Sequence, residues 1–194
     1  MKMITMPFRK KAQVGFTLLE TIVAIAIMTI VLAALLVLLT NFYKVFNAQQ
    51  STARVSGSAT IAGNELQAKI SQATQIVTSA TISGTLYTTD SDTLVLELPS
   101  INGFGAVIAG TYDYAVFYVS SGALYERVQP NGASSRPTIY KQLSNSISST
   151  SFTYNSGDVT QATKVDINIL MQLTAGRTTS THQLKQTLYL RNQS

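Results

Sequence analysis

The sequence has no cysteine and no tryptophan, and its single histidine is His182. The lack of cysteine excludes disulfide bonds, cysteine-ligated metals and a thiolate nucleophile. His182 follows the polar residues 179–181, and we expect it to be a solvated loop residue just before the last strand. No G-x-S-x-G nucleophile elbow is present, and the glycines of residues 103–105 are too few to cradle a phosphate. The sequence therefore predicts a protein that is not an enzyme and that needs no cofactor or metal.

Charged residues are scarce, at 12% of the chain, and they are unevenly placed. Lys2, Arg9, Lys10 and Lys11 precede the first acid, and without residues 1–15 the chain carries ten basic and nine acidic side chains. The net charge of +5 is therefore a topology signal, because basic residues hold an N-terminus in the cytoplasm and leave the rest of the chain outside. Nucleic acid is not the expected partner, since a nucleic-acid-binding domain usually keeps a basic stripe on its folded surface.

Proline is also scarce, and none occurs between Phe16 and Thr78, so nothing forces a break in a long helix there. Residues 21–40 carry no charge and would span about 30 Å as a helix, which matches the hydrocarbon thickness of a membrane. The apolar run is longer than the 7–15 residues, roughly, of a cleaved secretory signal, and no small-residue cleavage site follows it closely. By hydrophobicity alone, the segment is an uncleaved membrane anchor.

The six residues GFTLLE, at positions 15–20, favour a more specific interpretation. Together with the basic residues before them and the apolar run after them, they resemble the processing site of type IV pilins and of the pseudopilins of type II secretion and competence systems. The resemblance implies that residues 1–15 are a leader, which a prepilin peptidase removes by cutting between Gly15 and Phe16. It also implies that the new amino group of Phe16 is methylated.

Glu20 is the one acid at the edge of the apolar run. An ionised carboxylate at the centre of a membrane costs roughly 2.5–3.5 kcal/mol. The family resemblance implies that cleavage creates an ammonium on Phe16, and two opposite charges about 4 Å apart attract by roughly 4 kcal/mol at an effective dielectric of 20. We expect Glu20 of one subunit to pair with the Phe16 ammonium of its neighbour, which would fix the register of assembly. The alternative is an interfacial acid without a partner.

The sequence predicts one helix over about residues 17–76, because a helical repeat continues beyond the apolar run. Its apolar face holds Ala59, Ala62, Leu66, Ile70, Ala73 and Val77, and its polar face holds Asn64, Gln67, Lys69 and Gln72. Gly57 and Gly63 weaken this helix by up to about 1 kcal/mol each and allow it to bend. We divide the helix into a transmembrane or filament-core half, residues 16–40, and an amphipathic half, residues 41–77.

Residues 78–194 contain strand patterns without helical patterns between them, which favours antiparallel pairing. The first predicted strand is residues 93–98. Residues 112–119 and 123–128 are predicted to form a hairpin around the turn Ser120-Ser121-Gly122. Residues 165–173 form another predicted strand, and a last strand runs through Leu184 and Leu190 and ends at Arg191-Asn192. The predicted fold class is α+β, with one long N-terminal helix packed against a twisted antiparallel sheet. The pilin family's fold is similar to this outline.

Three local patterns have more than one interpretation. Asp90-Ser91-Asp92 is predicted to be a turn, because two acids are too few for a calcium site that needs six to eight oxygen ligands. The tyrosines are predicted to form cross-strand pairs, with a ligand surface as the alternative. They are Tyr112, Tyr114, Tyr118, Tyr125 and Tyr140, with Phe117 on the opposite face of its strand. Residues 144–151 are predicted to be a polar surface loop.

The predicted function is a structural subunit of a type IV pilus-like filament or a type II secretion pseudopilus. Before assembly, the subunit is expected to cross the inner membrane once, with its C-terminal domain outside the cytoplasm. It is then expected to enter a cell-surface or periplasmic filament. The implied partners are the prepilin peptidase, other pilin or pseudopilin subunits, the inner-membrane assembly platform and, before assembly, the lipid bilayer. The chain lacks the C-terminal cysteine pair and the mid-membrane proline of many major pilins, which favours a pseudopilin or minor subunit. The alternatives are a DNA-uptake pseudopilin and a membrane-anchored binding protein or enzyme.

Overall fold

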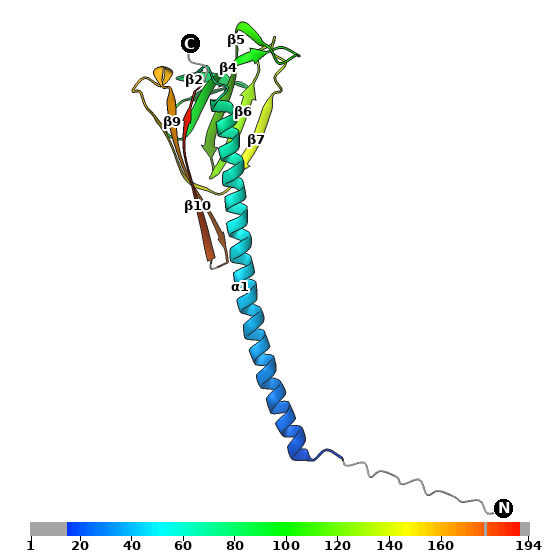
Figure 1. Cartoon of the computed structure of the whole chain (residues 1–194). Coiled ribbons are helices and arrows are strands. Elements are labelled where there is room, and N and C mark those ends of the chain that lie inside the picture. Colours follow the sequence, from blue (N-terminus) through cyan, green and yellow to red (C-terminus); the bar gives the residue numbers. More distant parts are fainter. Residues whose placement is uncertain (1–14, 177, 191–194) are drawn as a thin grey trace, which may run out of the picture. The chain divides into compact units, whose positions relative to one another are not determined.

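The computed structural model describes residues 15–176 and 178–190 (Figure 1). The chain forms two compact units, Met1–Val45 and Phe46–Ser194, and the long helix contributes residues to both. The elements are α1 (Leu18–Ile70), β1 (Gln75–Ile76), β2 (Ser79–Ile82), β3 (Thr85–Thr88), β4 (Thr93–Ile101), β5 (Val107–Ser120), β6 (Ala123–Gln129), β7 (Ile139–Ser144), β8 (Ile147–Tyr154), the 3-10 turn η1 (Val159–Gln161), β9 (Lys164–Ala175) and β10 (Thr178–Tyr189).

Helix α1 changes character along its length. From Leu18 to Leu39 its large apolar side chains are 48% to 81% exposed within the structure. In the second unit one face is buried, as the three- and four-residue spacing predicts. The buried residues there are Ser51, Val55, Ala59, Ala62, Gly63, Leu66 and Ile70. The predicted apolar face of the helix is therefore confirmed up to Ile70.

The helix ends at Ile70, earlier than the predicted end near residue 76, and this boundary was predicted wrongly. Gln72 N and Ala73 N donate to carbonyls three residues back, which tightens the last turn. Thr74 N then donates to Glu97 O at 2.9 Å, so the chain has joined the sheet as β1. Ala73 and Ile76 are buried all the same, because a tight turn and a short strand keep them on the core side. The spacing of apolar residues therefore continues although the helix does not.

In the residues that the structure describes, all strand pairs are antiparallel, and they form three sheets. The largest has the order β1-β4-β5-β6-β7, the second has the order β10-β9-β8, and β2-β3 is a two-stranded hairpin. The predicted β5–β6 hairpin is confirmed, and its turn residues Ser121 and Gly122 have φ angles of 52° and 73°. The residues predicted to be a single sheet are thus distributed over separate sheets, while the antiparallel α+β class is confirmed.

One hydrophobic core lies between α1 and the two larger sheets. It joins Leu66 of α1 to Phe117 of the five-stranded sheet and to Ile169 of the three-stranded sheet, all fully buried. Gly63 allows close packing here, because an added Cβ would lie 3.1 Å from Gln186 Nε2 and 3.3 Å from a methyl carbon of Leu184. Gly57 faces open space instead. A helix packed on antiparallel sheets is therefore the architecture of the second unit.

The β2–β3 hairpin covers part of the outer face of the five-stranded sheet. Ile82 of the hairpin, with Val95 and Val116 of the sheet, forms a second buried cluster, and the half-buried Tyr118 packs against it. Ser83 N donates a hydrogen bond to the side chain of Gln129, which fastens the hairpin to β6. These two strands were not predicted from the sequence. Each has only four residues, two of which are serine or threonine, and Ser83-Gly84 separates the two strands.

Two loop predictions were wrong. His182 lies inside β10, opposite Met171 of β9, and is half-buried. Residues 144–151 are mostly strand, since β7 ends at Ser144 and β8 begins at Ile147. Serine and threonine form cross-strand pairs readily, so a polar segment without apolar alternation is still able to form a strand beside β9. Arg191-Asn192 and Arg177 lie outside the described residues.

Candidate functional site

The first turn of α1 holds a reciprocal cap between Thr17 and Glu20. Glu20 N donates to Thr17 Oγ1, and Thr17 N donates to Glu20 Oε2, both at 3.3 Å. The Thr17 hydroxyl also lies 3.3 Å from the same carboxylate oxygen. This is a capping box, in which two backbone N–H groups without helical acceptors are satisfied by side chains. The signal for this cap, T-x-x-E, is present within GFTLLE, but only a role of Glu20 in assembly was predicted from the sequence.

Gly15 and Phe16 come directly before this cap, outside the helix. No atom lies within 4 Å of a Cβ built on Gly15, and Phe16 is 86% exposed. The peptide bond between them is therefore unobstructed by the rest of the described chain. The predicted leader charges Arg9, Lys10 and Lys11 lie outside the described residues.

The part of α1 that follows has the properties of a membrane span. Among the described residues it is the one helix long and apolar enough to cross a bilayer, and none of its most apolar stretch is buried. A core helix of a soluble protein would hide that surface. Thr29 donates its hydroxyl to the Ile25 and Ala26 carbonyls at 2.8 Å each, which satisfies a polar group within the apolar stretch.

A buried ion pair connects the strand loops of the second unit to the end of α1. Asp113, fully buried on β5, accepts from Arg136 Nε at 2.8 Å, and Arg136 also donates to the side chain of Gln72 and to Pro99 O. Burial alone would raise the pKa of Asp113, but hydrogen bonds from Asn131 N, Ser100, Arg136 and Ser134 together lower it. Every partner of this carboxylate is a structural contact, so the site is an anchor for the loop between β6 and β7.

A second charged group lies between α1 and the sheet. Glu126 of β6 is buried, and its Oε1 atom lies 3.5 Å from Lys69 Nζ without a hydrogen bond in the described structure. Burial raises the pKa of Glu126, although Lys69 opposes that shift. Glu65 of α1 pairs with Lys141 of β7 beside it. These pairs attach the amphipathic half of α1 to β6 and β7.

Three of the five predicted tyrosines, Tyr118, Tyr125 and Tyr140, form cross-strand contacts on the outer face of the five-stranded sheet. Tyr118 stacks on Tyr125 with 5.3 Å between ring centroids, and Tyr125 stacks on Tyr140 at 6.0 Å. The guanidinium of Arg127 lies 4.3 Å from the ring centre of Tyr140. Burial, followed by a hydrogen bond with Tyr87, raises the pKa of Tyr118 to about 12. The ladder connects the β2–β3 hairpin to β7, and Tyr140 remains 66% exposed.

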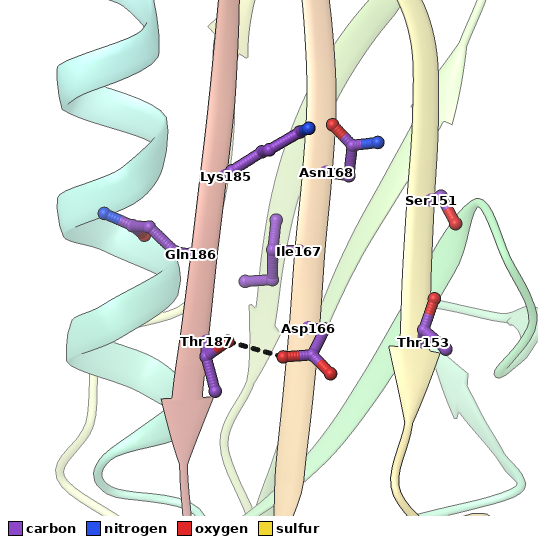
Figure 2. A pocket seen from close by; sticks show the side chains of 8 residues that line it. All are labelled: Ser151, Thr153, Asp166, Ile167, Asn168, Lys185, Gln186 and Thr187. Atoms are coloured by element: carbon purple, nitrogen blue, oxygen red, sulfur yellow. Dashed lines mark hydrogen bonds between the residues drawn. The ribbon is translucent and has the colours of Figure 1, made fainter.

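A shallow polar hollow of about 340 Å³ lies on the three-stranded sheet (Figure 2). It is lined by Ser151, Thr153, Asp166, Ile167, Asn168, Lys185, Gln186 and Thr187. Asp166 already accepts from the Thr187 hydroxyl at 2.5 Å and from Lys164 Nζ at 3.0 Å, and the first of these contacts lowers its pKa most. Figure 2 shows Gln186 directed towards α1, away from the polar side chains. The hollow offers hydrogen bonds, and its one carboxylate, Asp166, already has the Thr187 hydroxyl and Lys164 as partners.

The Asp90-Ser91-Asp92 turn is confirmed. Asp90 Oδ1 accepts from Asp92 N at 2.8 Å and from Thr93 N at 2.7 Å, which is an Asx-type turn leading into β4. Within residues 15–176 and 178–190, no three histidine or acidic side chains gather closely enough to hold a metal ion.

Residues 10–36 match the family model for the prokaryotic N-terminal methylation motif. The match covers GFTLLE and the first turns of α1, and this motif is the prepilin-type signature of type IV pilins and pseudopilins. No curated protein and no solved structure matches the chain.

The chain therefore carries the prepilin signature, and the recognition made from GFTLLE is confirmed. The signature belongs to a class of structural proteins and not to an enzyme class, and it implies processing by a prepilin peptidase. With the exposed apolar part of α1, it indicates membrane anchoring through one N-terminal span.

Proposed function

We propose that the chain is a structural subunit of a type IV pilus-like filament or a type II secretion pseudopilus. A prepilin peptidase cuts between Gly15 and Phe16 on the cytoplasmic side of the inner membrane and methylates the amino group of Phe16. The subunit waits in the bilayer with its second unit outside. An inner-membrane assembly platform then moves it into the filament, where helix–helix contacts replace lipid contacts.

The observation that carries this proposal is the position of the methylation motif at the start of α1, directly before an apolar surface that nothing in the described part of the chain covers. A plain membrane anchor needs that surface, but it does not need GFTLLE. A filament subunit needs both, because the exposed face must pack against other helices once the lipid is left behind.

Glu20 has two proposed roles in succession. In the isolated chain its carboxylate caps Thr17 N. In a filament we expect it to attract the Phe16 ammonium of a neighbouring subunit, and the geometry of that pairing would fix the axial register. The low local dielectric of packed helices strengthens the pairing.

Mass spectrometry of the protein isolated from membranes tests the processing step. We expect a chain that begins at Phe16 and carries one methyl group. A chain that still includes residues 1–15 would contradict the proposal and favour a simple tether for a binding ectodomain. A Gly15→Leu variant is the control, because it should keep its leader while it still inserts into the membrane.

The substitution Glu20→Ala tests the assembly step. We expect the variant to insert into the membrane and to be processed, but to be absent from sheared filaments. Thr29→Ala is a suitable comparison, since it removes a polar group from the same helix without removing a charge. Normal incorporation of Glu20→Ala would contradict the proposed register contact.

A further inference from the structure

The turn between β4 and β5 holds an aromatic side chain out in solvent. Phe104, at the tip of this turn, is 98% exposed. Asn102 Oδ1 accepts from Phe104 N and from Ala106 N, both at 3.0 Å, and Gly105 N donates to Asn102 O at 2.9 Å. Gly105 has a φ angle of 80°, a conformation that suits glycine. These bonds hold the backbone of the turn, so its shape does not depend on burying Phe104.

The hairpin around Phe104 carries no charge. Between Glu97 and Asp113, both of which are buried, the sequence has no acidic or basic residue. Val107 is also 64% exposed beside the tip. An aromatic side chain has 150–250 Å², roughly, of surface to bury. Phe104 packs on nothing in its own unit, which is the property of a contact residue.

The same unit contains a groove that is able to receive such a side chain. It lies where α1 passes the turn after β7 and the end of β9, and it is lined by Val55, Gly57, Ile61, Asn145 and Leu173, with Arg54 as its one charged residue. The groove encloses about 370 Å³, and no atom lies within 4 Å of a Cβ placed on Gly57. Because protein cavities of roughly 150 Å³ hold benzene, the groove has room for a phenyl ring.

Phe104 and the groove lie at different positions along the axis of α1. Ser135 N donates to Ile101 O at 2.7 Å, and Arg136 joins Pro99 O to Gln72, so the base of the hairpin is fastened just beyond the end of α1. Gly57 lies about 20 Å further back along the helix. A contact between two different patches is heterologous, and repeated heterologous contacts build an open chain of subunits.

We propose that Phe104 of one copy binds in the groove around Gly57 of the next copy along the filament. This inference rests on the proposed function. A contact of this size falls far below the roughly 1,200 Å² that a stable complex buries, so it would not recruit a soluble partner. A copy already held alongside through α1 meets the groove at a high effective concentration. Every copy of the chain carries both the exposed Phe104 and the groove, and this favours a second copy as the occupant.

The inference also departs from the expected role as a minor subunit. A subunit present once at a filament tip has no second copy beside it. The contact between Phe104 and the groove requires copies of the same chain to follow one another.

Cysteine cross-linking tests the contact directly, because the chain has no cysteine of its own. The full chain carrying both Gly103→Cys and Gly57→Cys, which keeps Phe104 and places a thiol directly beside it, is expressed with an assembly machinery and oxidised mildly in intact cells. We expect a ladder of dimers, trimers and longer products that disappears on reduction. Gly103→Cys with Gly157→Cys is the matched control, since Gly157 also faces open space, and it should give no ladder.

Each outcome separates the contact from the proposed function. Filaments without a ladder would overturn the contact and leave the filament role intact. A ladder in membranes without filaments would support the contact and overturn the filament role, and the absence of both would overturn both. Dimers from Gly103→Cys alone would show a symmetric contact between two turns, which also overturns the inference.

A second variant tests the contribution of the aromatic ring. We expect Phe104→Ala to lower the number of filaments by about tenfold or more, because a buried phenyl ring contributes at least that factor to an equilibrium constant. Leu86→Ala removes another exposed apolar side chain and should leave filament number unchanged. Equal numbers of filaments from Phe104→Ala and the wild type would overturn the inference.

Discussion

Asp113 is the buried charge on which the loops of the second unit depend. Replacing it with alanine leaves Arg136 without its carboxylate and Ser100 without its acceptor. We expect Asp113→Ala to lower the free energy of unfolding by about 3–5 kcal/mol, as is typical when one partner of a buried pair is removed. Urea unfolding in detergent, followed by tyrosine fluorescence, measures this. Asp166→Ala, at a partly exposed ion pair on β9, should lower the free energy of unfolding far less; equal losses would contradict the assignment.

The same residue gives a signed dependence on pH. The hydrogen bonds to Asp113 lower its pKa in the folded chain below the ordinary value of 3.8. A lowered pKa adds stability above the unfolded-state value, and that stability is lost as the pH falls through the folded-state pKa. We therefore expect the stability difference between wild type and Asp113→Ala to shrink below about pH 4. Unfolding measured from pH 7 downward tests this, and a constant difference would contradict it.

Glu126 should show the opposite sign. Burial raises its pKa, so its contribution to stability is complete below the unfolded-state pKa and is lost as the pH rises through the folded-state value. We expect Glu126→Gln to gain stability relative to the wild type as the pH rises from 4 to 7, because the glutamine never ionises. The pH series of unfolding measures the difference. A difference that stays flat or falls would show that Lys69 fully compensates the buried charge.

At the scale of an element, α1 contains two glycines in contrasting surroundings. Gly57 faces open space, whereas a Cβ on Gly63 would press on Gln186 and Leu184. We expect Gly57→Ala to stabilise the second unit by about 0.5–1 kcal/mol through helix propensity. Gly63→Ala should gain less or lose stability, because β10 has to shift. Chemical unfolding of the two variants side by side tests this, and equal gains would contradict the close packing at Gly63.

The sequence was a good guide to elements whose apolar pattern reports burial. The buried face of α1, the β5–β6 hairpin and β9 were predicted because each alternates or repeats in step with its own geometry. The end of α1 was not predictable from spacing, since Ala73 and Ile76 are buried by a turn and a strand that keep the helical interval. Strand β8 was missed because five of its eight residues are serine or threonine, which hides the strand pattern although Phe152 reaches the core.

The candidate site divides in the same way. GFTLLE could be recognised from the sequence because a processing motif is a short contiguous segment. The Asp113–Arg136 anchor could not be predicted, because its residues come from separate strands and loops that only the fold brings together. The same holds for Phe104, whose significance depends on its lack of contacts.

At the scale of the whole molecule, the two proposed roles of Glu20 can be separated by one conservative substitution. Glutamine keeps a side-chain oxygen that accepts from Thr17 N, but it carries no charge. We expect Glu20→Gln to retain the capped first turn and normal processing, yet to enter filaments as poorly as Glu20→Ala. Quantifying each variant in sheared filaments and in membranes measures this. Incorporation of Glu20→Gln at the wild-type level would assign Glu20 to capping alone.

The direct passage from α1 into β1 has a mechanical consequence. Tension applied along the helix reaches Thr74 and β1, whose hydrogen bonds to β4 must be sheared before the chain can lengthen there. Arg136 provides a second mechanical connection, since it donates hydrogen bonds to both the Gln72 side chain and Pro99 O. A force along α1 is thus shared between the hydrogen bonds of β1 and those of Arg136, and the fold resists extension at the point where the helix ends.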